Sequence, residues 1–195
     1  MKGDLKMEKN IMIVGVGGQG TLLTSRIIGK VALEAGLDVK ISEVHGMAQR
    51  GGSVVTFVRF GDKVSEPVVE EGEADVIIAF ERLEAARYAH FLKKDGALVV
   101  NDCRIDPMTV VIGAKKYPEG ILDELAKEHP VHSIDAGKIA LELGTRKVLN
   151  SVVLGFGASF IGFDKNDWLS VIENTVPPKT IEINKTAFER GYSAK

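Results

Sequence analysis

A glycine-rich segment near the N-terminus constrains the fold more than any other feature of this sequence. The apolar run Ile11 to Val14 leads into it, and Thr21 to Ala35 follows with apolar residues at helical spacing. A strand that passes through glycines directly into a helix indicates an α/β protein whose backbone amides and helix N-terminus can bind a phosphate group. The candidate ligand residues are Gly15, Gly17, Gly18, Gln19 and Gly20. A turn that serves only packing or a protein contact is the alternative.

Strand-like and helix-like segments alternate along much of the remaining chain. Strands are expected at 38–44, 53–60, 75–80, 97–101, 109–113 and 131–134, and helices at 82–92, 119–128, 136–143, 147–162, 165–174 and 178–190, with Gly191 after the last helix. This pattern predicts an α/β fold, a Rossmann-like three-layer sandwich with a mostly parallel sheet and a C-terminal helical flap. We expect a single domain, 1–195, with its α/β core at about 10–145 and its helical part at about 146–191.

A second glycine-containing segment, residues 45–52, follows the second expected strand. Its histidine, glutamine, arginine and three glycines could present a cation and amide donors to an anionic or carbonyl group. The candidates are His45, Gln49, Arg50, Gly51 and Gly52. A structural turn, with Arg50 in an ion pair and His45 satisfied by hydrogen bonds, is an equally good explanation. No metal site is expected, because no second His or Cys stands at ligand spacing from His45.

The same segment argues against an ordinary nicotinamide-dependent dehydrogenase. In a dinucleotide-binding fold an acidic residue about 20 positions after the glycines binds a ribose, and Glu43 stands near that place. No helix fits between Glu43 and the strand that begins at Ser53. The second half of a regular mononucleotide-binding unit is therefore missing.

Composition and charge disfavour several classes of protein. The chain has 195 residues with 25 Lys and Arg against 27 Asp and Glu, a net charge of −2, which argues against a nucleic-acid binder or a polybasic membrane binder. Its one cysteine, Cys103, excludes an internal disulfide and an iron–sulfur cluster built from this chain alone. No segment reads as a membrane span or a signal peptide, so a cytoplasmic protein is expected.

Taken together, the two glycine motifs resemble a known family. GVGGQG at 15–20 and EVHGMAQRGGSVVTFVRFG at 43–61 are similar to the γ component of 2-oxoacid:ferredoxin oxidoreductases, and most similar to the β subunit of the indolepyruvate branch. The family's closing pattern is matched by Asn150 to Gly155, Pro178 to Asn184, Ala187, Phe188 and Gly191. The resemblance covers roughly residues 10–191, and its specific part, HGMAQRGG at 45–52, favours an arylpyruvate substrate.

The resemblance implies a subunit of an enzyme complex that is inactive alone. Such complexes decarboxylate a 2-oxoacid, such as indolepyruvate or pyruvate, on thiamine diphosphate, pass electrons through [4Fe-4S] clusters to ferredoxin, and form an acyl-CoA. Both cofactors are expected on a large partner subunit, which fits the single cysteine here. This chain would hold no cofactor firmly and would supply loops to the active site or the CoA site. Arg50 would contact a substrate carboxylate or a CoA phosphate, unless the loop mainly docks the large subunit.

Other functions and a self-association stay open from the sequence. A free-standing nucleotide-binding module and a small NAD(P)-dependent reductase both need a ribose-binding acid on a regular turn, which the segment after Glu43 does not provide. A homodimer of the isolated chain is expected, because Lys147 to Gly162 and the face around Trp168 are apolar, and a docking subunit has surface to cover. Nucleic acid and membrane are not expected as partners.

Overall fold

One sheet organises the protein, whose computed structural model describes residues 7–46 and 51–194. The strands of this part are β1 (Lys9–Val16), β2 (Asp38–His45), β3 (Ser53–Gly61), β4 (Ala74–Ala79), β5 (Leu92–Asn101) and β6 (Val131–Ile134). They pair in the order β2-β3-β1-β4-β5-β6. β1, β4, β5 and β6 pair in parallel, whereas β3 is antiparallel to both β1 and β2. Only β3 opposes the common direction, so the expected mostly parallel sheet is confirmed.

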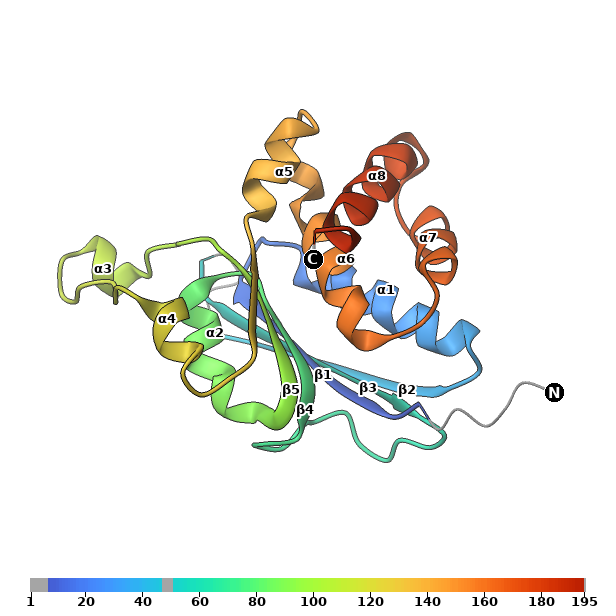
Figure 1. Cartoon of the computed structure of the whole chain (residues 1–195), viewed down its shortest axis with the longest axis horizontal. Coiled ribbons are helices and arrows are strands. Elements are labelled where there is room, and N and C mark those ends of the chain that lie inside the picture. Colours follow the sequence, from blue (N-terminus) through green and yellow to red (C-terminus); the bar gives the residue numbers. More distant parts are fainter. Residues whose placement is uncertain (1–6, 47–50, 195) are drawn as a thin grey trace.

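Helices cover both faces of this sheet (Figure 1). One layer contains α1 (Thr21–Glu34), α5 (Ala136–Glu142), α6 (Leu149–Ile161), α7 (Lys165–Glu173) and α8 (Ile181–Tyr192). The opposite layer contains α2 (Arg82–Tyr88) and α4 (Ile121–Leu125). Short 3-10 turns occur at Ala89–Phe91, Arg146–Val148 and Pro178–Thr180. The Rossmann-like three-layer sandwich expected from the sequence is therefore confirmed. Among the described helices, none has the length and apolar character of a membrane span.

Strand β1 and helix α1 show how the sequence produces this core. Ile11 and Ile13 face the α1 layer and Met12 faces the α2 layer, all without exposed surface, because a parallel strand covered on both sides is apolar throughout. Gly20, at φ 87°, occupies the N-cap of α1, and Gly36, at φ 84°, follows its end. Both ends of α1 are thus marked by backbone conformations that favour glycine.

Strands β2 and β3 form an antiparallel pair rather than parts of a second βα unit. β2 and β3 pair antiparallel along their whole length, from Asp38 opposite Gly61 to His45 opposite Val54. This confirms the inference that the second half of a mononucleotide-binding unit is missing. This pairing brings the end of β2 to the carboxyl edge of the sheet, the edge at which β1, β4 and β5 also end.

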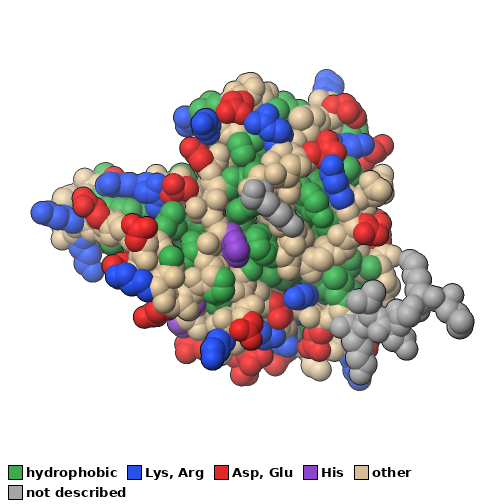
Figure 2. Space-filling model, in the orientation of Figure 1, with side chains coloured by type: hydrophobic (Ala, Val, Ile, Leu, Met, Phe, Trp, Pro, Cys, Tyr) green, Lys and Arg blue, Asp and Glu red, His purple; other side chains and the backbone are tan. Residues whose placement is uncertain are grey.

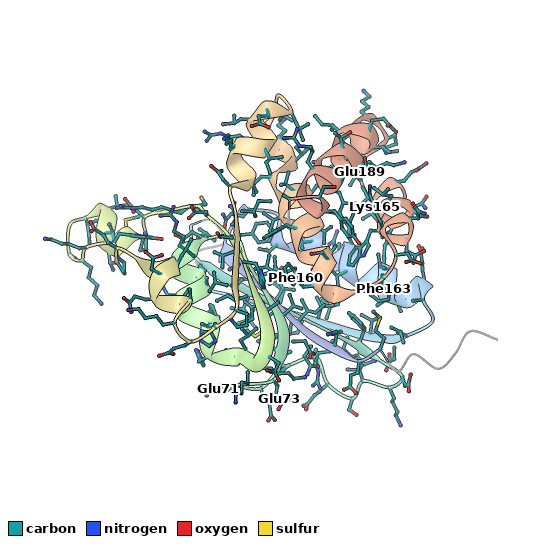
Figure 3. All side chains as sticks on the ribbon, in the orientation of Figure 1. Glu71, Glu73, Phe160, Phe163, Lys165 and Glu189 are labelled. Carbon is teal, nitrogen blue, oxygen red and sulfur yellow. The ribbon has the colours of Figure 1, made fainter. Side chains whose placement is uncertain are left out.

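The C-terminal helices are part of the core and not an apolar outer surface. Val152 and Leu154 of α6 are buried within the α1 layer, and Trp168 of α7 has no exposed surface. Lys165 of α7 pairs with Glu189 of α8 across 2.8 Å, at the outside of this layer (Figure 3). The apolar surface expected along Lys147 to Gly162 and around Trp168 was therefore wrong, because the chain's own helices cover it. That argument for a homodimer is lost.

Glycines let α6 and α8 approach each other closely. A Cβ atom on Gly155 would lie 2.0 Å from the backbone oxygen of Phe188, and a Cβ atom on Gly191 would lie 2.0 Å from that of Val152. Gly191 therefore lies inside α8, and the prediction that it follows the helix end was wrong. The lack of a side chain at Gly191 lets α8 pack closely against α6 and does not mark the end of the helix.

The segment predicted as a strand at 109–113 is instead a short helix, α3 (Met108–Val111). The amides of Val110 and Val111 donate to the carbonyl oxygen of Pro107, at 2.8 and 3.0 Å. β-branched residues favour strands only where a neighbouring strand offers pairing and packing. This segment projects away from the body of the protein, at the left of Figure 1, where the sheet provides no such neighbour.

Candidate functional site

The two glycine motifs meet at the carboxyl edge of the sheet. The amide of Gly17 donates a hydrogen bond to the carbonyl oxygen of Gly52 at 2.9 Å, and the amide of Gly51 donates to that of Gly17 at 3.4 Å. The turn after β1 and the end of the β2–β3 connection are thus one unit. Gln49 and Arg50 lie outside the described residues.

An open hollow of about 480 Å³ lies beside this unit, between α1 and β2. Three of the predicted glycines and His45 line it together with residues that the motifs did not single out. The full lining is Gly17, Gly18, Gly20, Thr21, Leu22, Glu43, His45 and Val54. Gly15 and Gln19 do not line the hollow. Four of the eight described candidates therefore line the hollow, Gly51 and Gly52 are joined to them through Gly17, and Gly15 and Gln19 lie apart.

The glycine turn offers hydrogen-bond donors to the hollow. The amides of Gly18 and Gly20 have no acceptor among the described residues, and the first intrahelical bond of α1 runs from the Thr24 amide to the Gly20 carbonyl. The amides at the start of a helix have no intrahelical partner and carry partial positive charge. Asn150, from the first turn of α6, lies only 3.1 Å from the position of a Gly20 Cβ. This end of the hollow suits an anionic group.

The opposite wall carries two polar side chains on the same face of β2. The carboxylate of Glu43 accepts a hydrogen bond from Thr56 Oγ1 at 3.3 Å. His45 Nδ1 lies 3.1 Å from the carbonyl oxygen of Gly46, which can only accept, so this contact places a proton on Nδ1. The Nε2 atom of the exposed ring is then available as a hydrogen-bond acceptor.

Gln19 fills the place where a Rossmann-like protein would bind a dinucleotide. Its side-chain oxygen accepts from the Val16 amide at 2.7 Å, and its Nε2 donates to the Phe80 carbonyl at 3.0 Å. Asn101 Nδ2 donates to the same carbonyl at 3.1 Å, and Asn101 Oδ1 accepts from the amide of Ala136. Side chains therefore join the ends of β1, β4 and β5. Ligands of open α/β sheets bind where the strand order reverses, which is here between β1 and β4.

Gly15 supports this arrangement through close packing. A Cβ atom at Gly15 would lie 2.9 Å from Gln19 Oε1 and 3.0 Å from Phe80 Cβ. Gly15 and Gln19 therefore hold the turn against β4, and the structure gives them no place in the hollow.

Sequence reasoning missed four residues that line the hollow, Thr21, Leu22, Glu43 and Val54, and one that contacts the glycine turn, Asn150. Glu43 is two positions before His45, so the period of two in a strand places both on one face. From the sequence, Glu43 is indicated only as a ribose ligand. Asn150 approaches from a helix that is 130 positions after Gly20, and no local pattern indicates that contact.

The described residues offer little support for covalent or metal chemistry. Burial raises the pKa of the Cys103 thiol, and the nearby carboxylate of Glu81 raises it further. A thiol with a raised pKa holds little thiolate and is a weak nucleophile. No group of three or more His, Cys, Asp or Glu side chains in residues 7–46 and 51–194 is placed to hold a metal ion.

Comparisons with known proteins identify the family. The sequence profile described as "Pyruvate ferredoxin/flavodoxin oxidoreductase" matches residues 10–194. Two curated relatives, both called indolepyruvate oxidoreductase subunit IorB, come from Thermococcus kodakarensis and Archaeoglobus fulgidus. They are 44% and 45% identical to this chain, and the alignments cover 96% of it and 96% and 95% of the relatives.

Solved structures share the fold. A pyruvate oxidoreductase subunit PORC from Thermotoga maritima is 26% identical and matches with a TM-score of 0.72 over 96% of both chains. A 2-oxoglutarate:ferredoxin oxidoreductase from Magnetococcus marinus, solved with coenzyme A bound, has a TM-score of 0.73 at 20% identity. Here 96% of this chain matches 31% of the longer one. From its sequence and its fold, the chain belongs to the pyruvate ferredoxin/flavodoxin oxidoreductase family, as a small subunit of a 2-oxoacid:ferredoxin oxidoreductase.

Proposed function

We propose that this subunit supplies the hollow beside the glycine turn to the active site or the CoA site of the assembled oxidoreductase. The assembled enzyme would oxidatively decarboxylate an arylpyruvate such as indolepyruvate to an acyl-CoA, with ferredoxin as electron acceptor. The names of the IorB relatives support the substrate class. The proposal rests on one observation: the two glycine motifs are joined by hydrogen bonds, and an open hollow lies beside them.

The hollow is incomplete in the isolated chain. Glu43 and His45 are exposed, and so is part of Leu22. A ligand held there would remain in contact with water on one side, whereas enzymes usually exclude water from the reacting groups. A larger partner subunit that covers this edge would complete the site. That subunit is also expected to hold thiamine diphosphate and the [4Fe-4S] clusters, since one cysteine cannot ligate a cluster.

The polar groups of the hollow can orient a ligand, because its two ends favour different chemical groups. The amides of Gly18 and Gly20 and the start of α1 favour a carboxylate or a phosphate. The Glu43 carboxylate disfavours an anion beside it but accepts from an N–H or O–H group. His45 Nε2 can accept a hydrogen bond from a polar group between them. CoA carries phosphates, hydroxyls and amide N–H groups, and a 2-oxoacid carries a carboxylate, so either fits.

A free-standing dinucleotide-binding function is less well supported. The side chain of Gln19 occupies the point between β1 and β4 at which such a ligand would enter. We therefore place the ligand on the α1 side of the turn. Docking of the large subunit by the same loops is the remaining alternative.

Steady-state kinetics of the reconstituted complex test the proposal. His45→Ala should leave assembly intact and lower kcat/KM for CoA or for the 2-oxoacid about tenfold, the usual effect of losing one hydrogen bond to a charged group. His129→Ala is the matched control, because His129 precedes β6 at the opposite edge of the sheet. Unchanged constants for both substrates in a fully assembled His45→Ala complex would refute the ligand role.

A further inference from the structure

An arm of residues 104–117 projects from the carboxyl edge of the sheet and carries α3 at its tip (Figure 1). Met108, Val111 and Ile112 are 70%, 65% and 67% exposed. In the described chain no residue of α3 is buried, and none belongs to either core cluster. Three large apolar side chains on one short projection are unusual for a surface that stays in water.

The base of the arm is tied by one buried carboxylate. Glu81, only 1% exposed, accepts from the Ile105 amide at 3.2 Å, where the arm begins, and from the Tyr117 hydroxyl, where it ends. The guanidinium of Arg104 lies 4.4 Å from the centre of the Tyr117 ring. The two ends of the arm are thus held together, as in compact Ω-loops.

Hydrogen bonds also fix the inside of the arm. The Lys115 amide donates to the Thr109 carbonyl at 2.9 Å, and Arg104 pairs with Asp106 at 2.6 Å. The exposed apolar tip therefore belongs to an ordered projection whose conformation is set before any partner binds. Preorganisation of this kind lowers the ordering cost of association.

We infer that this arm docks the large partner subunit of the oxidoreductase, in an apolar socket with an acidic rim. The inference rests on the proposed function, because the arm and the hollow lie on the same edge. β5 ends at Asn101 beside β4, and β4 pairs with β1, so the arm leaves the sheet at the edge where the glycine turn also begins. A subunit large enough to cover the hollow lies within reach of the arm.

Charge on the arm supports an acidic rim on that partner. Lys115 and Lys116 are exposed just behind the tip, and neither makes an ion pair with a described residue. Arg104 and Asp106 neutralise each other, which leaves the arm at about +2 in a chain whose net charge is −2. Basic side chains are visible along this projection at the left of Figure 2. Opposite charges at an interface rim steer association.

A second copy of this chain is a poorer occupant. Three side chains can bury at most a few hundred Å² of surface, well below the roughly 800 Å² that each partner buries in a stable interface. The arm must therefore be one part of a larger contact. A symmetric contact between two arms would also bring Lys115 and Lys116 toward their own copies. The larger contact is the one expected around the hollow.

Binding of the full chain to the purified large subunit tests the inference. The triple variant M108S/V111S/I112S should bind at least about tenfold more weakly, because truncated apolar anchors at an interface commonly cost that much or more. The control L33S/V68S removes side chains that are 57% and 48% exposed and lie at the opposite edge of the sheet. It should bind as the wild type does. Thermal melts of each isolated chain establish that the variants fold.

A second pair of measurements separates docking from catalysis. K115E/K116E should also bind the large subunit more weakly than the wild type does. The difference in affinity between the two should become smaller as the salt concentration is raised. At saturating concentrations of either arm variant the complex should recover the wild-type kcat, because the arm touches no substrate. A defect in turnover at full assembly would assign the arm to the active site and overturn docking.

Two further results would refute the inference. One is a folded triple variant whose affinity for the large subunit equals that of the wild type. The other is self-association of the wild-type chain through the arm, together with arm substitutions that leave the affinity for the large subunit unchanged. A second copy of the chain would then be the occupant. Neither result depends on whether His45 affects catalysis, so failure here leaves the proposed function standing.

Discussion

The side-chain amide of Gln19 donates a hydrogen bond to the backbone carbonyl of Phe80 across 3.0 Å. This contact joins the glycine turn after β1 to the end of β4. In a dinucleotide-binding protein the gap between these two strand ends receives the ligand. Here a side chain closes it, and the open hollow lies instead on the α1 side of the turn. A sequence pattern typical of nucleotide binding is therefore found here in a turn whose open hollow lies at a different place from the dinucleotide site.

Replacing Gln19 should destabilise the fold without touching the hollow. Gln19→Leu keeps a similar volume but leaves the Val16 amide without its 2.7 Å acceptor. An unpaired group in this partly buried place should lower the free energy of unfolding by about 1–3 kcal/mol in urea titrations. Asn174→Leu, at an exposed helix end, is the control and should change it by less than about 0.5 kcal/mol. Equal stability of the two variants would mean that the Gln19 bridge contributes nothing.

The close contact of α6 and α8 gives a second prediction. In Gly155→Ala the new methyl group would meet the Phe188 backbone oxygen at 2.0 Å, so a helix must shift. We expect a loss of at least about 2–3 kcal/mol in the free energy of unfolding. Gly157→Ala, on the same helix, meets only the end of the flexible Ile78 side chain, at 2.7 Å. Its thermal unfolding should change much less, and a reversed order would contradict the packing described here.

Tyr117 should make the stability of the fold depend on alkaline pH. Burial, and then the hydrogen bond to Glu81, raise the pKa of Tyr117. The folded chain therefore keeps the phenol proton beyond the pH at which the unfolded chain loses it. This contribution is complete below about pH 10 and is lost as the pH rises further.

Unfolding of Tyr117→Phe measures this contribution. At neutral pH the variant should lose about 1.5–3 kcal/mol, the value of a hydrogen bond to a charged group. Its stability should then fall less steeply than that of the wild type between about pH 10 and 12. Parallel curves for the two proteins across this range would show that the hydroxyl is not held by Glu81.

Arg50 lies outside the described residues, and its role stays a prediction from the sequence. Arg50→Lys keeps the charge but removes the planar two-point contact that a guanidinium makes with a carboxylate or phosphate. In the assembled enzyme this should cost about 1.5–3 kcal/mol, or about 10- to 150-fold in kcat or KM. Dissociation of the complex while the chain stays folded would identify a docking element. Full activity with unchanged constants would remove Arg50 from the site.

Local sequence patterns predicted the elements that depend on local causes. The strand, glycine turn and helix at the N-terminus follow from apolar spacing and from backbone that only glycine adopts easily. The absence of a helix between β2 and β3 follows from the lack of room for one, whereas their antiparallel pairing is seen only in the structure. The meeting of the two glycine motifs is not indicated by either motif alone; it results from β1 and β2 ending at one edge of the sheet.

Features that depend on distant partners could not be predicted in this way. The residues of α3 have the composition of a strand, but no strand lies beside them to pair with. Gly191 reads as a helix end because its actual partner, Val152, is far away in the sequence. The same holds for the contact of Asn150 with Gly20 and for the bridge from Gln19 to Phe80.

Hydrogen exchange on the reconstituted complex distinguishes ligand binding at the glycine turn from subunit docking. In the proposed function the glycine turn contacts a ligand of the assembled enzyme and does more than dock a subunit. Adding CoA or the 2-oxoacid to the assembled complex should slow exchange in a peptide that covers residues 15–24. A peptide that covers residues 121–134, on the other face of the sheet, should not change. If assembly alone gave all the protection of residues 15–24 and neither ligand added to it, the turn would be a docking element, which would contradict the proposed function.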